Sequence, residues 1–169
     1  AAHIDACRLD LKQNPLYEKE NITYLNTHYY GGIKKYQWTA IPLAIHGVIC
    51  KKDGTTVNVV IGENMDDPVF CISDILPHLA QSQMQNKASE FITGEDLDLI
   101  FGSIIPKKES NDKEEKSKKK EKNIAKKIIL ELLKEKYKIE EDDFLSSELE
   151  IVPAGKARDC GLDRSMVIG

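Results

Sequence analysis

Apolar and polar residues alternate through most of the first 63 residues, with the period of two that is typical of half-buried β-strands. HIDACRLDL (residues 3–11) begins the pattern, and Asn14-Pro15 then predicts a turn. Asp53-Gly54 predicts a tight hairpin turn, because such turns need a positive φ. The strand-like runs around these turns cover residues 22–30, 33–50 and 56–63. The first third of the chain therefore predicts short antiparallel strands that form a barrel or sandwich.

After residue 66 the pattern mixes helix and strand. Ser73 or Asp74 predicts the N-cap of a short helix that carries Pro77 near its first turn. Residues 124–139 place apolar side chains on one helical face, which predicts an amphipathic helix packed on the core. The members of this face are Ile124, Ile128, Ile129, Leu132, Leu133 and Tyr137. Two further strands are predicted, within residues 94–106 and 144–155. These elements predict an α+β fold, a β-rich barrel or sandwich with two or three flanking helices.

Composition narrows the class of protein. Hydrophobic residues make up 41% of the chain and charged residues 31%, as in globular proteins. The net charge of −4 argues against a general affinity for nucleic acid, and no apolar run predicts a signal peptide or a membrane span. The four cysteines are scattered without a CxxC pair, which indicates reduced thiols in a cytoplasmic protein.

Residues 107–123 are almost entirely charged and predict a mobile loop, since they contain little that could be buried. Lysines dominate this block, and they raise the alternative of a basic segment that binds nucleic acid. Five acidic side chains are interleaved with those lysines, so this alternative ranks last.

Candidate chemistry is sparse on residue patterns alone. His3 and Asp5 lie two apart on a predicted strand, so both side chains point to one face, where the imidazole could bind a metal and the carboxylate could orient it. The other histidines, His28, His46 and His78, are scattered and favour structural or surface roles. The chain carries neither HExxH nor a Cys/His cluster with metal-ligand spacing.

Four segments, however, occur in a recognisable order: HIDACRLDLKQNPLYE, THYYGGIKKYQW, VIGENMDDPVFCISDILPHL and ELEIVPAGKARDCGLDRSMVIG. In this order they resemble the aspartyl aminopeptidase/aminopeptidase I family of dizinc metallopeptidases, specifically its bacterial branch. The resemblance covers the whole chain apart from the lysine-rich block. It implies a peptidase that removes acidic or neutral N-terminal residues from peptides with two zinc ions per active site.

The resemblance also assigns roles to single residues. His3 matches the family's zinc-binding histidine, and Asp5 matches the aspartate that orients the metal site. His78 matches a histidine that reaches across a dimer interface into the neighbouring active site. The family's other ligands lie downstream of the motif that ends at Gly169, and Asp163 precedes the expected bridging aspartate and receives no role.

The implied organisation has three parts. Residues 1–9 are a stub of the catalytic domain with the HID motif, residues 10–150 are an inserted β-rich oligomerisation domain, and residues 151–169 return to the catalytic domain. We therefore expect a fragment of a zinc aminopeptidase that forms dimers and larger homo-oligomers up to dodecamers and is inactive alone. The alternative is an assembly module without catalysis; membrane and nucleic-acid partners are not expected.

Overall fold

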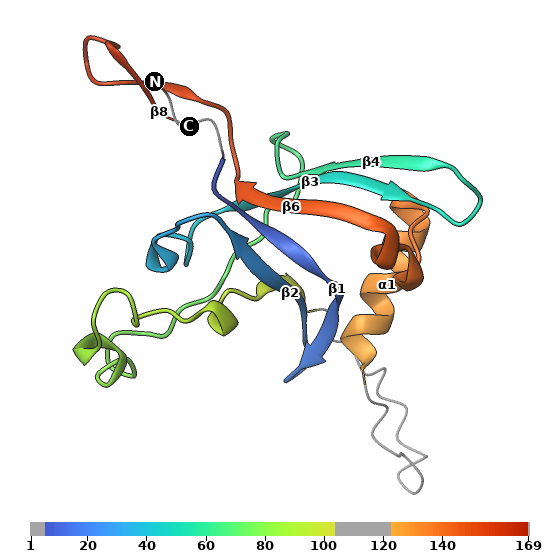
Figure 1. Cartoon of the computed structure of the whole chain (residues 1–169), viewed down its shortest axis with the longest axis horizontal. Coiled ribbons are helices and arrows are strands. Elements are labelled where there is room, and N and C mark those ends of the chain that lie inside the picture. The colour runs from blue at the N-terminus through green and yellow to red at the C-terminus, as the bar shows by residue number, and fades with distance from the viewer. Residues whose placement is uncertain (1–5, 104–122, 169) are drawn as a thin grey trace, which may run out of the picture.

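The structure is a computed structural model that describes residues 6–103 and 123–168. Its body is one curled antiparallel sheet with the strand order β4-β3-β6-β1-β2-β5 (Figure 1). The strands are β1 (Arg8–Lys19), β2 (Ile22–Tyr30), β3 (Leu43–Cys50), β4 (Thr56–Ile61), β5 (Leu99–Gly102) and β6 (Ser147–Pro153). The helix α1 (Ile124–Tyr137) and a separate hairpin, β7 (Arg158–Cys160) and β8 (Met166–Ile168), complete the described part. The expected α+β class is confirmed.

A short segment, residues 70–72, closes the curled sheet. Phe70 and Leu43 of β3 exchange both backbone hydrogen bonds, at 2.8 and 2.9 Å, and Ile100 of β5 donates to the Cys71 carbonyl at 2.9 Å. The strands β3 and β5 lie far apart in the strand order, so this one segment joins two distant parts of the sheet. The sheet therefore forms a partly closed barrel around its core.

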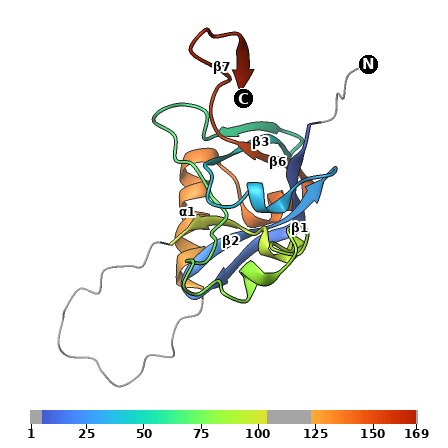
Figure 2. The same cartoon turned by 90° about the vertical axis from the view of Figure 1, so that its left-hand side faces the viewer.

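The core fills the concave side of the sheet. Leu9, Leu25, Leu43 and Ile151 are at most 1% exposed, and each such burial contributes about 1.5–3 kcal/mol. Figure 2 shows α1 beside the sheet, and the helix buries Ala125, Ile129 and Leu133. Gly102 lets the helix approach β5, because a Cβ there would lie 2.4 Å from Cδ1 of Ile129.

The predicted helix of residues 124–139 is confirmed, although Leu132 of its expected buried face stays 46% exposed. No helix in the described part of the chain is long and apolar enough to cross a membrane.

The predicted turn at Asn14-Pro15 is wrong. The strand β1 runs through both residues, and its register with β2 shifts between Leu11 and Leu16. Proline cannot donate to the strand ladder, so it is accommodated at this irregularity and does not end the strand. The chain turns instead at Glu20 and Asn21, whose φ values of 52° and 61° are those of a two-residue hairpin turn.

The predicted helix after Ser73 or Asp74 is also wrong. Residues 77–79 form a turn, and the next ordered piece is a 3-10 helix, Gln83–Gln85. Ile75, Leu76 and Leu79 are 52%, 60% and 72% exposed, so they do not pack on the core. A short helix gains most of its stability from a packed apolar face, and this segment has none.

The chain enters and leaves the sheet side by side. Leu9 near the start of β1 pairs with Ile151 near the end of β6. The Arg8 Nε atom lies 2.7 Å from Asp10 Oδ1 and 3.0 Å from Glu150 Oε1, which ties the two strands together. Beyond β6 the hairpin β7–β8 projects away from the sheet (Figure 1).

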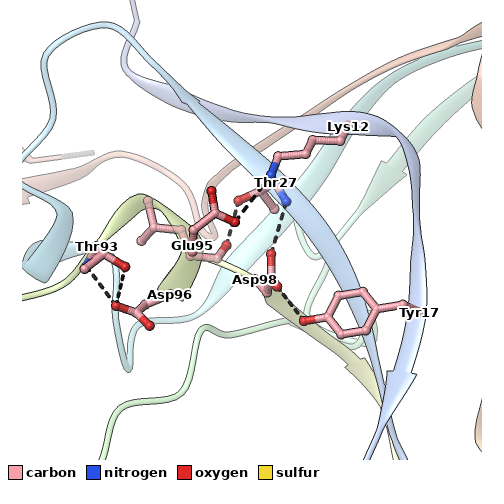
Figure 3. Close-up of polar contacts among 8 residues, drawn as sticks. Lys12, Tyr17, Thr27, Thr93, Glu95, Asp96 and Asp98 are labelled. Atoms are coloured by element: carbon pink, nitrogen blue, oxygen red, sulfur yellow. Dashed lines mark hydrogen bonds and ion pairs between the residues drawn. The ribbon is translucent and has the colours of Figure 1, made fainter.

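Polar contacts attach the segment before β5 to β1 and β2 (Figure 3). Thr27 donates from Oγ1 to the Leu97 carbonyl at 2.6 Å and from its backbone N–H to Asp98 Oδ1 at 3.4 Å. The Tyr17 hydroxyl donates to Asp98 Oδ2. Burial, and then this hydrogen bond, raise the pKa of Tyr17 above its ordinary value.

A substitution at Gly47 can test how closely the backbones of the paired strands β3 and β6 approach each other. Its φ is 144°, and an added Cβ would lie 1.9 Å from the Glu148 carbonyl oxygen. We expect Gly47→Ala to lower the free energy of unfolding by more than about 2 kcal/mol, because the backbone would have to move. Urea unfolding of the 169-residue chain, followed by the fluorescence of buried Trp38, measures this. Gly32→Ala is the control, since nothing lies within 4 Å of its Cβ position; an equal loss there would contradict the prediction.

Tyr17 predicts a pH dependence of stability. Its pKa in the folded chain lies above the unfolded value of about 10, so the folded state holds the proton more tightly. The resulting stabilisation is complete below about pH 10 and is lost as the pH rises toward the folded pKa. Tyr17→Phe should flatten the fall in unfolding free energy above about pH 10, measured by urea titrations at several pH values. Tyr36→Phe, at a ring that is 38% exposed, is the control; the same flattening there would refute the assignment.

Candidate functional site

The predicted zinc-site residues His3 and Asp5 lie outside the described residues, so their roles stay predictions. The charged block predicted to be a mobile loop lies outside them as well, apart from Asn123, which precedes α1. No group of three or more His, Cys, Asp or Glu side chains in residues 6–103 and 123–168 is placed to hold a metal ion.

His78 is described, and it lies exposed on the turn of residues 77–79. Leu79 donates from its backbone N–H to the Leu76 carbonyl at 2.9 Å, and Ala80 donates to the Pro77 carbonyl at 3.2 Å. Ala80, directly after the turn, is only 3% exposed. The imidazole of His78 is thus presented outward on a hydrogen-bonded turn.

Hydrogen bonds within the segment order the chain around this turn. The Asp74 side chain accepts hydrogen bonds from the Ile75 backbone N–H at 2.8 Å and from Gln83 Nε2 at 3.1 Å. Farther along, Asp96 Oδ2 accepts from the backbone N–H and the hydroxyl of Thr93, at 2.9 and 2.7 Å, and caps the 3-10 helix Gly94–Asp96 (Figure 3). With residues 70–72 bound to the sheet before the turn, both ends of the segment are attached while its tip faces solvent.

The turn also carries a set of exposed apolar side chains, which we call the turn patch: Ile75, Leu76, Leu79 and Met84. Each of them is more than half exposed. The residue pattern predicts a short apolar helix here, and the exposure of these side chains was missed. Pro77 in the middle of the segment was the signal against a buried helix, because proline interrupts helical hydrogen bonding.

The remaining histidines have local partners. His46 Nε2 lies 2.7 Å from Glu63 Oε1, which links β3 to the loop after β4. The ring of His28 is stacked on Tyr29, with the centroids 5.2 Å apart. These local contacts are in keeping with structural or surface roles for His28 and His46, which stay predictions.

A cavity of about 530 Å³ lies between α1, β5 and the residues after β4. Its walls include Phe70, Phe101, Ile129 and Tyr137, and its charged lining residues are Glu135 and Lys136. Its described lining contains no serine, cysteine or histidine and is mostly apolar.

Comparison with known proteins gives these features a family. Residues 1–169 match the family model of the aminopeptidase I zinc metalloproteases, M18. The "probable M18 family aminopeptidase 1" of Clostridium acetobutylicum is 63% identical over 99% of this chain. That match covers 34% of the relative, so the chain spans about a third of the length of the curated relatives it matches.

Solved structures agree. The crystal structure of the M18-family aminopeptidase from Thermotoga maritima superposes with a TM-score of 0.85 at 49% identity, over 98% of this chain and 34% of that one. The crystal structure of aminopeptidase I from Clostridium acetobutylicum gives 0.83 at 57% identity, with the same coverage. From its matching sequence and its shared fold, this chain belongs to the M18 family of aminopeptidase I zinc metalloproteases.

Proposed function

We propose that this chain is the oligomerisation portion of a zinc aminopeptidase that removes acidic or neutral N-terminal residues from peptides. The observation that carries the proposal is the turn patch, which presents His78 outward among exposed apolar side chains. Apolar side chains gathered in this way are typical of a surface that another protein covers. A second subunit seated there would bring the imidazole into contact with its own surface.

The division into an inserted domain and two catalytic stubs is part of the proposal. Leu9 and Ile151 are paired, so the chain enters and leaves the sheet at one place, as an inserted domain requires. The hairpin β7–β8 leaves Met166, Val167 and Ile168 more than half exposed. A lone two-stranded hairpin is marginal in water, so these side chains favour packing on a further domain. The proposed boundaries at residues 1–9, 10–150 and 151–169 lie close to the start of β1 at Arg8 and the end of β6 at Pro153.

The N-terminal motif supplies side chains whose donor atoms could bind zinc. A neutral imidazole and a carboxylate are donors that suit zinc, so His3 would bind the metal and Asp5 would orient the site. The chemistry that two bound zinc ions would supply is polarisation of the scissile carbonyl and activation of a water molecule. We place the other ligands in the part of the relatives' length that this chain does not span. The 169-residue chain alone is therefore proposed to be inactive.

His78 would act in the active site of the neighbouring subunit. Its N–H can donate to the oxyanion that forms when water attacks the peptide carbonyl. Residues 70–72 attach the segment to the sheet, and the hydrogen bonds of Asp74 order it internally, which favours such a preorganised role. The homo-oligomer, from dimers up to dodecamers, is then part of the catalytic unit.

The unpaired cysteine thiols support the proposed cytoplasmic location. Cys7, Cys50, Cys71 and Cys160 are all unpaired, as in a reducing compartment. The alternative of an assembly module without catalysis differs from the proposal only in the activity of the whole protein.

The activity is tested on the full-length protein. We expect it to hydrolyse aminoacyl-anilides, to lose activity on chelation and to recover it with zinc, whereas the 169-residue chain stays inactive with zinc. His3→Ala should lower the bound zinc measured by elemental analysis, since a ligand is removed. Activity of the short chain would overturn the view that ligands are missing from it. A full-length protein without activity would favour the assembly module.

His78 is tested by its effect on turnover. His78→Ala in the full-length oligomer should lower kcat by about 10²–10³ with an unchanged zinc content, since one oxyanion donor is lost. Steady-state kinetics and zinc analysis give the two readouts. His28→Ala is the matched control, because His28 is an exposed histidine on β2. An unchanged kcat in His78→Ala would remove the role in trans.

A further inference from the structure

The strand β4 forms an open edge of the sheet. It pairs with β3 from Ile61 opposite Ile45 to Thr56 opposite Cys50, and no other strand of the described chain pairs with its outer side (Figure 1). The opposite edge, β5, is bonded by residues 70–72 through Cys71. The backbone donors and acceptors on the outer side of β4 are therefore the ones left open to another strand.

The sequence of β4 lacks the features that normally protect an edge. Natural edge strands carry charged residues, prolines or bulges that prevent pairing. Thr56–Ile61 reads TVNVVI, without a charge or a proline, in a chain that is 31% charged. Its register with β3 is continuous, so no bulge twists the edge away. Such a strand is suited to pair with a further strand.

We propose that β4 pairs antiparallel with β4 of a second copy of this chain across a two-fold axis. The strand alternates strictly, with Thr56, Asn58 and Val60 exposed and Val57, Val59 and Ile61 turned toward the core. Across such an axis, opposite residues share a face when Asn58 meets either Asn58 or Val60 of the second copy. Outward residues then meet outward residues, and core-facing residues meet core-facing residues. The strand is thus complementary to itself.

Charge distribution favours the antiparallel direction. The turn before β4 carries Lys51, Lys52 and Asp53, whereas the loop after it carries Glu63, Asp66 and Asp67. Antiparallel pairing brings the net positive turn of each copy beside the acidic loop of the other, and parallel pairing would bring like charges together. Within each copy Lys52 is 3.0 Å from Asp142, but these side chains are 82% and 70% exposed, so the pair is weak and can rearrange.

This contact is separate from the turn patch. Figure 1 shows β4 and the segment after residue 72 on different sides of the molecule. The inference rests on the proposed oligomerisation role and names a second contact surface for it. A subunit with two separate self-contacts builds assemblies larger than a dimer.

Cross-linking tests the pairing directly in the full-length protein. Asn58→Cys combined with Val60→Cys places a thiol for either of the two registers, because cysteines opposite one another in paired strands lie within disulfide reach. We expect a covalent dimer on a non-reducing gel after mild oxidation, and its loss on reduction. Wild type reports any linkage through the native cysteines, and Leu145→Cys, at an exposed position on a 3-10 helix, reports random collision. Linkage no greater than in these controls would overturn the inference. That result is expected if another domain of the same polypeptide covers β4.

A disruptive variant separates this inference from the function on which it rests. Val60→Lys puts a charge at a 52% exposed position of the edge, and we expect the full-length oligomer to fall to a smaller species in sedimentation. Leu145→Lys should keep the wild-type size. A wild-type oligomer with an unchanged Val60→Lys variant would refute β4 pairing alone, whereas a monomeric wild type would refute the oligomerisation role itself. If Val60→Lys fails to fold by circular dichroism, the cross-linking result decides.

Discussion

The backbone hydrogen bonds of residues 70–72 are the constraint on which the rest of the structure depends. They join β3 to β5 across the curled sheet, so the concave side becomes an enclosed core. Phe70 of this segment is stacked on Phe101 of β5, with the ring centroids 5.4 Å apart, and both rings line the apolar cavity beside α1. The same segment leads directly into the turn that carries His78. Closure of the barrel and presentation of the imidazole are thus consequences of one local pairing.

The interior of the domain is buried and continuous, whereas several features on its surface are left uncovered. Its core is continuous from β1 to α1, and the buried residues at its centre are almost fully excluded from water. Outside the core, the turn patch, the β4 edge and the hairpin β7–β8 leave apolar side chains or backbone groups uncovered. These features lie apart on the chain, which suits a domain that contacts both its own polypeptide and other subunits.

Strand prediction succeeded where alternation coincided with burial on one face. The runs leading to β2, β3, β4 and β6 and the Asp53-Gly54 turn were all predicted, and Gly54 has the positive φ of 84° that such a turn favours. Prediction failed at Pro15 and Pro77 for opposite reasons. Pro15 was given a turn, but the strand irregularity accommodates it; Pro77 was placed in a helix, but that segment has no packed face to stabilise one.

Sequence alone determined the family, the α+β class and the approximate positions of β2 to β6, because side-chain alternation and long motifs are local properties that survive without coordinates. Tertiary structure decided which apolar residues are buried. Leu76 and Leu79 are as apolar as Leu43, yet only Leu43 lies within the closed barrel. Burial depends on which distant segments meet, and residues 70–72 meet β3 and β5 through backbone groups that every sequence shares. For that physical reason the exposed setting of His78 and the open edge at β4 became visible only in the folded chain.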